Sequence, residues 1–204
     1  KAKKVIFKKG ITSIGAGAFD NFQKLEEVVL PERLETIKAS AFFSCYRLKK
    51  INVPKTLRTI ASDVFIATKI ESFSLRRVKK IGNMCFLDSK IKEVYLSKDC
   101  RSSSLVFWGC EKLKKVTLED GIKKISYGMF CDTALKTIDI PGSVFQIGED
   151  AFADCKKLQK VTLHEGIKKV GKNAFYNTSL KEITIPSTVT QLGKNAFRWE
   201  STEK

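Results

Sequence analysis

The residues of this chain that could support metal binding, thiol chemistry or acid–base catalysis are six cysteines and one histidine. The single His164 excludes His-rich metal sites and most histidine-based catalysis. No two cysteines form a Cys-x-x-Cys pair, and three of them (Cys45, Cys110 and Cys155) each follow a recurring phenylalanine by three residues. That shared position favours buried thiols that pack as small hydrophobes. A disulfide or a metal site is the alternative.

Catalytic and phosphate-binding motifs are absent from the pattern. His164 follows a predicted strand in the turn LHEG, where we expect a solvated side chain, and no Ser/His/Asp or Cys/His set shares its register. The glycines that could suggest a phosphate loop recur after five of the I-x-x-I segments, which is typical of structural turns. These are Gly15, Gly82, Gly148, Gly171 and Gly193. We therefore predict a protein that is not an enzyme and that uses no cofactor or metal.

The positive charge of the chain is a second feature that could support binding, because the net charge is +16. Only seven of its 38 basic residues are arginine. A lysine-rich surface attracts anions in general, whereas bidentate recognition of phosphate or guanine favours arginine. Nucleic acid is therefore disfavoured as a specific partner. No run of about 18 apolar residues predicts a membrane span, and no apolar signal-peptide segment follows Lys1–Lys4.

One frame repeats along the chain and must position all of these residues. It reads I-x-x-I-G-x-x-A-F, then C-x-x-L or T-x-L, then x-x-V-x-L, often followed by proline. Its phenylalanine recurs every 21 to 23 residues, at Phe19, Phe42, Phe65, Phe86, Phe107, Phe130, Phe152, Phe175 and Phe197. Nine of the 14 phenylalanines occupy this one column.

The V-x-L pairs of the frame predict nine short parallel strands, because residues two apart share one side of a strand. Their centres lie near residues 6, 29, 52, 74, 95, 117, 139, 162 and 184. Prolines end several of them, since proline cannot donate to the ladder. A coil of this length cannot bury its own apolar side, so we expect stacked coils with one continuous core.

The whole chain, residues 1–204, is predicted to be one repeat domain of about nine coils. It forms an open, right-handed, β-rich superhelix with a parallel sheet on the concave face and tight turns or single helical turns at each A-F on the other. Residues 1–10 and 189–204 are partial terminal coils. An irregular coil lies near 99–107, where Asp99 and Ser102 replace the isoleucines of the frame; it must bulge, unwind, or shift register to use Cys100 and Ser103.

The repeat resembles the BspA-type leucine-rich repeats of bacterial and some protozoan surface proteins. The matching motifs are IGAGAF (14–19), AFFSC (41–45), AFADC (151–155), NAFYNTSL (173–180) and the closing IDIP and ITIP. The resemblance implies a leucine-rich-repeat solenoid in a cell-surface or secreted protein that acts in adhesion. The resemblance implies that the partner is another protein, such as a host matrix protein or another surface protein.

A protein partner is expected on the concave sheet, whose outward residues are varied and polar. We predict docking around Tyr95, Lys115 and Thr117, with Trp108 as a second candidate on the other side of the coil, because tyrosine and tryptophan dominate binding hot spots. Trp108 also ends a row of four apolar residues that follow the repeat phenylalanines. That row, Phe43, Ile66, Leu87 and Trp108, is either an interface or local packing.

The alternative function is binding of an anionic polymer, such as acidic polysaccharide, teichoic acid or nucleic acid, by lysine-rich flanks. Lys92, Lys114 and Lys136 occupy one column beside the sheet in successive coils. A second set lies in the I-x-x-I segments, as Lys79/Lys80, Lys123/Lys124 and Lys168/Lys169. A merely solvated lysine-rich surface would show the same pattern.

Overall fold

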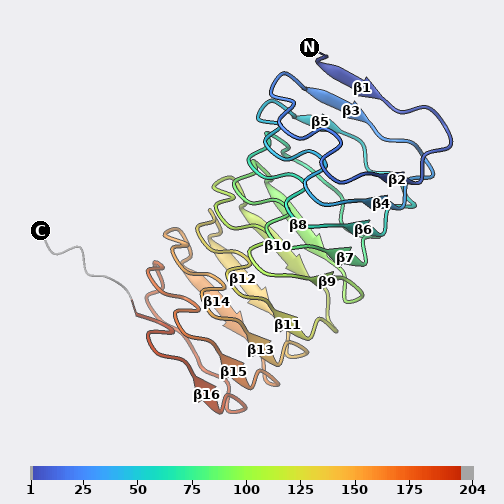
Figure 1. Ribbon diagram of the computed structural model, residues 1–204. Helices are drawn as coiled ribbons and strands as arrows, with labels where there is room; N and C mark the ends of the chain where they lie inside the picture. Colours follow the sequence, from blue (N-terminus) through green and yellow to red (C-terminus); the bar gives the residue numbers. More distant parts are fainter. Residues whose placement is uncertain (1, 199–204) are drawn as a thin grey trace, which may run out of the picture.

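The computed structural model describes residues 2–198, and its coils stack along one axis from the blue end to the red end (Figure 1). The chain winds into a parallel β-solenoid of about eight turns, close to the nine predicted. Residue 1 and residues 199–204, which belong to the predicted terminal coils, lie outside the described part. No helix forms between residues 2 and 198, so of the two predicted alternatives the A-F segments form tight turns and not single helical turns.

A first row of strands, here called the front sheet, contains the V-x-L segments (Figure 1). Its members are β1 (Lys4–Ile6), β3 (Glu27–Val29), β5 (Lys50–Ile51), β8 (Glu93–Leu96), β10 (Lys115–Leu118), β12 (Thr137–Ile140) and β14 (Lys160–Leu163). All pairings are parallel and keep the repeat register, so that Val28 lies between Val5 and Ile51. Seven of the nine predicted strands therefore form, and none forms at residues 74 and 184.

A second row, here called the second sheet, contains the I-x-x-I segments, for which the sequence analysis predicted no strands. Its strands have two residues each. They are β2 (Ser13–Ile14), β4 (Thr36–Ile37), β6 (Thr59–Ile60), β7 (Lys80–Ile81), β9 (Arg101–Ser102), β11 (Lys124–Ile125), β13 (Gln146–Ile147), β15 (Lys169–Val170) and β16 (Gln191–Leu192). In seven of them the last residue is buried in the core, while Ser102 of β9 is half-buried and Leu192 of β16 is exposed.

The third side of each coil, here called the turn face, contains the A-F segments. Alternate amides along each segment donate to carbonyls of the next coil, as Phe107 N does to Met129 O at 3.0 Å. Two residues per coil, two before and two after the phenylalanine, have a positive φ, as in Asp150 and Asp154. These left-handed residues turn the backbone back before a helical hydrogen bond can repeat, and Asp, Asn and Gly tolerate them best.

The phenylalanine column forms the centre of the core. From Phe19 to Phe197 each ring stacks on the next, with centroids 5.1 to 5.7 Å apart and planes within 24°. The seven inner rings are fully buried, and the buried apolar residues form one cluster along the solenoid. Four of the five repeat glycines lie against the backbone of the preceding coil, so that a Cβ on Gly171 would collide with Gly148 and Glu149, whereas Gly15 has no such contact.

In the irregular coil near 99–107, β9 keeps its register with the coil before it but pairs with no strand of the coil after it. Arg101 and Ser102 pair with Lys80 and Ile81. Ser102, and not Ser103, thus occupies the isoleucine column without a bulge, while Cys100 packs partly against the core. No bridge joins β9 to β11, so the second sheet has five strands on one side of this seam and four on the other.

A serine hydroxyl takes the place of one lost backbone bond at the seam. In regular coils the residue after the second isoleucine donates its amide to the preceding coil, as Gly148 N does to Ile125 O at 2.9 Å. At the seam the Ser126 hydroxyl donates instead to Ser102 O, at 3.0 Å. The phenylalanine stack crosses the same point without a break, since Phe107 and Phe130 are 5.6 Å apart.

Candidate binding surfaces

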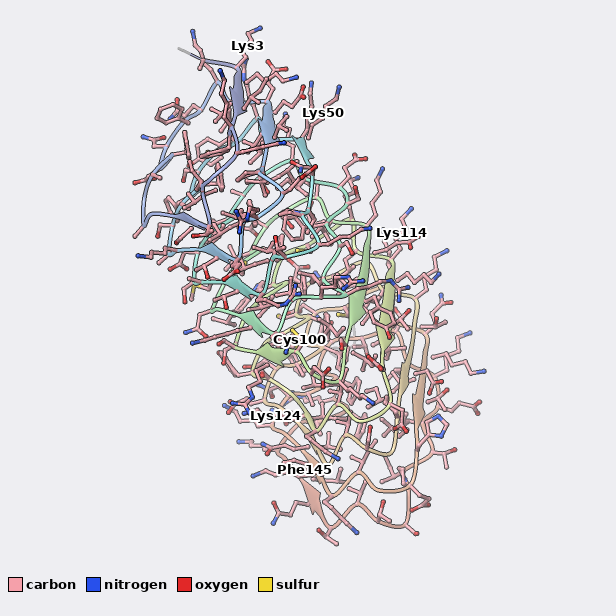
Figure 2. All side chains as sticks on the ribbon, turned by 90° about the vertical axis from the view of Figure 1, so that its right-hand side faces the viewer. Lys3, Lys50, Cys100, Lys114, Lys124 and Phe145 are labelled. Carbon is pink, nitrogen blue, oxygen red and sulfur yellow. The ribbon has the colours of Figure 1, made fainter. Side chains whose placement is uncertain are left out.

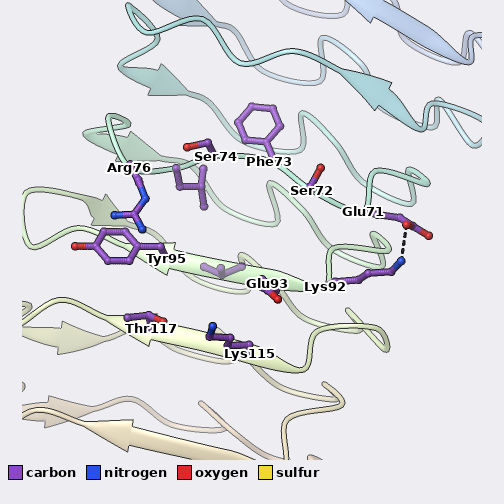
Figure 3. A pocket seen from close by; sticks show the side chains of 12 residues that line it. Glu71, Ser72, Phe73, Ser74, Arg76, Lys92, Glu93, Tyr95, Lys115 and Thr117 are labelled. Carbon is purple, nitrogen blue, oxygen red and sulfur yellow. Dashed lines mark hydrogen bonds and ion pairs between the residues drawn. The ribbon is translucent and has the colours of Figure 1, made fainter.

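The front sheet brings Tyr95, Lys115 and Thr117 together, as predicted from the sequence. β8 and β10 pair so that Tyr95 lies opposite Thr117 and Glu93 opposite Lys115. All four side chains point outward, because the valines and leucines between them face the core. The three predicted docking residues therefore line one side of a shallow cleft of about 550 Å³ (Figure 3).

The cleft exists because the front sheet is interrupted beside β8. Residues 71–75 follow the repeat register, but they form no strand between β5 and β8. Phe73 stands where the other coils have valine or isoleucine, and its ring packs against Phe65 and Phe86 with centroids 5.2 and 5.3 Å away. Ser72 and Ser74, which flank it, have weak strand preference. The missing strand leaves backbone and polar side chains open to a ligand.

Tyr95 is held at the edge of this cleft by two charged neighbours. The Arg76 guanidinium lies over its ring, 4.0 Å from the centroid, in a cation–π contact (Figure 3). Partial burial and a hydrogen bond with the Glu119 carboxylate raise the pKa of Tyr95. The Glu119 carboxylate also accepts from Lys98 N at 3.1 Å, which contributes most to the lowered pKa of Glu119. Tyr95 is thus a pre-positioned amphipathic ring.

The front sheet carries charges of both signs. Its outermost row alternates lysine with glutamate and threonine, and Lys4 pairs with Glu27 at 2.7 Å. In the predicted lysine column, Lys92 forms an ion pair with Glu71 beside the cleft (Figure 3). Lys114 and Lys136 occupy the expected positions in the next coils and form no ion pair within residues 2–198. The predicted ladder is therefore partly neutralised.

The second sheet collects the other predicted lysines on its outer side. Lys80, Lys124 and Lys169 are the outward residues of β7, β11 and β15, and all three are exposed. Lys79 and Lys123 precede two of these strands and are exposed as well. Sequence reasoning did not include Arg101, which pairs with Lys80 and extends this basic surface.

Trp108 lies on the turn face, away from the cleft. It is half-buried, as are Phe43, Ile66 and Leu87 in the three preceding coils. Next to it, a Cβ on Gly128 would lie 3.5 Å from the indole ring. The four side chains follow one another in consecutive coils, as predicted.

The cysteines and the histidine have the surroundings that the repeat predicts. Cys45, Cys110 and Cys155 are buried free thiols. Burial raises their pKa values to about 11, 12 and 11. His164 is an exposed turn residue whose Nε2 lies 2.7 Å from an Asp139 oxygen. Within the described residues, no group of three or more His, Cys, Asp or Glu side chains could hold a metal ion.

Two features of the surface escaped the sequence analysis. Phe145 is exposed to 47%, beside the lysine-rich second sheet, although most phenylalanines of the chain are core residues. The recurring Asp, Asn and Gly at two positions per coil mark left-handed turns and were visible as a periodic signal. Between residues 2 and 198, the structure contains no helix long and apolar enough to cross a membrane.

Comparison with known proteins agrees with this architecture. Residues 1–104 and 103–203 match the family described as BspA type leucine rich repeat region. A leucine-rich repeat protein from Bacteroides ovatus has a similar structure, with a TM-score of 0.88 and 27% identity over 93% of this chain. This chain covers 53% of that protein. No curated protein matches the sequence.

Two further solved structures share the fold at lower identity. A leucine-rich repeat protein from Eubacterium ventriosum has a TM-score of 0.69 and 24% identity, covering 94% of this chain and 56% of its own. A leucine rich cell surface protein from Faecalibacterium prausnitzii has a TM-score of 0.59 and 23% identity, covering 96% and 57%. The chain thus spans about half the length of these relatives. With two matched stretches that together cover nearly all of its length, it belongs to the BspA-type leucine-rich-repeat family.

Proposed function

We propose that the chain is a non-catalytic binding module of a cell-surface or secreted protein, and that it acts in adhesion by docking a protein partner on the front sheet. The cleft beside Tyr95 is the observation that carries this proposal. It combines an amphipathic ring, an adjacent arginine and a row of small polar side chains on a rigid scaffold. Such surfaces offer contact area at little ordering cost.

The mixed charge of the front sheet supports a protein partner over a polymer of one charge. Acidic and basic side chains alternate there, and a protein surface can complement both signs. Family membership supports the same function, because leucine-rich repeats are typically non-catalytic protein-binding modules and BspA-type proteins are typically surface-associated. The cell-surface relative from Faecalibacterium prausnitzii is consistent with this location.

The test is a binding panel of purified extracellular-matrix proteins against the wild-type chain and the Tyr95→Ala variant. Removal of a hot-spot tyrosine should weaken binding by about 2 kcal/mol, roughly 30-fold. Tyr46→Ala is the matched control, since Tyr46 is 46% exposed and lies outside the cleft. Trp108→Ala tests the second candidate position.

Equal losses for Tyr95→Ala and Tyr46→Ala would place the partner elsewhere on the solenoid. A loss confined to Trp108→Ala would move the docking site to the turn face. If no matrix protein binds at physiological salt, the adhesion proposal fails.

A further inference from the structure

The outer side of the second sheet carries a concentration of positive charge that the proposed protein docking does not use. Seven exposed basic side chains lie there in four of five consecutive coils, and we call them the basic sheet face. They are Lys79, Lys80, Arg101, Lys123, Lys124, Lys168 and Lys169. In the view that labels Lys124 and Phe145, this side is well separated from the side of Lys114 and Lys50 (Figure 2).

Backbone hydrogen bonds fix the order of these residues along the solenoid. Arg101 N donates to Lys79 O at 2.8 Å, which places these two side by side. Beyond the seam, Phe145 N donates to Lys123 O, and Lys168 N donates to Phe145 O, both at 2.9 Å. Neighbouring strands lie about 4.8 Å apart, so five coils extend the face over roughly 19 Å.

The charges of the basic sheet face are not neutralised within the protein. None of the seven side chains forms an ion pair in the described part of the chain. Two carboxylates stand near it: Asp99 borders a small cleft with Lys79, and Glu149 is paired with Lys172 at 3.0 Å. The front sheet, in contrast, places Glu26 between Lys3 and Lys49, with both ion pairs formed. A face of one sign suits a polyanion.

Phe145 indicates which polyanion fits. Its ring is 47% exposed and stands between Lys123 and Lys168 in the same column. A flat apolar side chain between two cations matches a pyranose ring, whose C–H side stacks on an aromatic ring while its acidic substituents reach the lysines. A single-stranded nucleic acid would instead require a row of aromatic side chains for successive bases. Six of the seven cations are lysines, which lack the fork that arginine offers to phosphate.

Charge spacing favours the same ligand. One coil advances by about 4.8 Å, close to the length of one sugar unit, whereas a B-form nucleic acid strand carries a charge about every 3.4 Å. We propose that the basic sheet face binds a linear acidic polysaccharide with one carboxylate per sugar. The polymer runs along the solenoid axis, with Phe145 under one ring. This site lies on a different sheet from the Tyr95 cleft and does not depend on it.

The experiment measures binding of a fluorescent polygalacturonate fragment to the whole chain by anisotropy, over a series of salt concentrations. One quadruple variant, Lys79→Gln, Lys80→Gln, Lys123→Gln and Lys124→Gln, removes four charges from the basic sheet face. A matched variant, Lys114→Gln, Lys136→Gln, Lys160→Gln and Lys181→Gln, removes four exposed lysines beside or on the front sheet. Both variants have the same net charge, so nonspecific attraction changes equally in the two.

We expect the first variant to lose at least about tenfold in affinity and to show a shallower dependence of log K on log salt. The matched variant should lose less than about threefold, and Phe145→Ala should weaken binding while leaving the salt slope unchanged. Circular dichroism of each variant confirms that the fold is retained. Equal losses in the two quadruple variants overturn the proposal, because net charge alone then explains binding. So does binding of single-stranded DNA of equal charge that matches or exceeds that of polygalacturonate.

Discussion

A single polar column connects the phenylalanine stack to the backbone. Three residues after each inner phenylalanine stands a cysteine, threonine or serine. The threonines donate to the phenylalanine carbonyl of their own coil, as Thr133 does to Phe130 O at 3.0 Å. The cysteines donate to the preceding coil, so that the Cys155 thiol also reaches Phe130 O, at 3.1 Å. The thiols are thus hydrogen-bonded core groups, as the shared spacing of the cysteines predicted.

The buried cysteines should resist alkylation in the native protein. At pH 8.5 a thiol whose pKa is about 12, such as Cys110, is almost entirely protonated, and only the thiolate reacts with iodoacetamide. Mass spectrometry after a timed native reaction should find Cys45, Cys110 and Cys155 unmodified and in no disulfide. Cys100, which is only partly buried, should react first and serves as the internal control. Rapid labelling of Cys110 would contradict the buried column.

Removing one ring from the stack should be costly. Phe130 is fully buried, with centroids 5.6 and 5.4 Å from Phe107 and Phe152, so Phe130→Ala leaves a cavity in mid-core. We expect the free energy of unfolding in urea to fall by about 3–5 kcal/mol. Phe145→Ala is the control, because its exposed ring should change stability by less than about 1 kcal/mol. A loss below about 1 kcal/mol at Phe130 would show that the column is not core.

At the scale of the element, strands were predictable from the sequence and their continuity was not. The Val-x-Leu alternation correctly predicted the positions of seven strands of the front sheet, because each apolar pair must face the core. Between the two predicted alternatives at A-F, Asp and Asn at positions such as Asp132 and Asn177 favour the tight turn, because these residues have a positive φ. The missing strand at residue 74 depends on the bulk of Phe73. Nothing in the residues around position 184 explains the other gap.

The seam can be tested by restoring the repeat residue. Ser102 stands in a column that other coils fill with isoleucine or valine. Its side chain is half-buried, and its hydroxyl lies 3.7 Å from Met129 Sδ. Ser102→Ile should raise the free energy of unfolding by about 1 kcal/mol, since it adds apolar burial. The reverse change in the neighbouring coil, Ile81→Ser, should lower it by at least about 2 kcal/mol. Chemical denaturation of both variants measures this, and destabilisation by Ser102→Ile would mean that the serine is required for packing.

At the scale of the whole molecule, coupling between coils is uneven. A solenoid is stabilised by contacts between neighbouring repeats, and at the seam the second sheet has lost its backbone pairing, whereas β8 and β10 still pair and the turn face keeps its hydrogen bonds. The sequence showed where the frame departs, at Asp99 and Ser102. The sequence did not show that β9 would pair with β7 but not with β11. That outcome depends on Ser126, whose hydroxyl, and not its amide, donates to Ser102 O. In the candidate site, the sequence predicted that Tyr95 lies beside Lys115 and Thr117. The contact between Arg76 and the Tyr95 ring was seen only in the folded structure.

Hydrogen exchange should locate this weak interface. The amides of Lys124 and Ser126 have no backbone acceptor in the preceding coil within the described residues. Gly171 N, in the equivalent position two coils later, donates to Ile147 O at 2.9 Å. We expect mass-spectrometric exchange to be faster in a peptide covering 123–126 than in one covering 168–171. Equal protection would show that the seam is held as firmly as a regular coil.

The unbroken stack of rings has a consequence for how such a chain can change over generations. Every coil offers the same ring to both neighbours, and the regular coils offer nearly the same ladder as well, so a copied or excised regular coil leaves matching surfaces at the join. Unequal crossing-over between repeats can therefore lengthen or shorten the molecule in whole steps, without redesign of its interior. Each step adds or removes one strip of binding surface on every side. The length of the solenoid can then vary while the contribution of each regular coil to stability stays nearly constant.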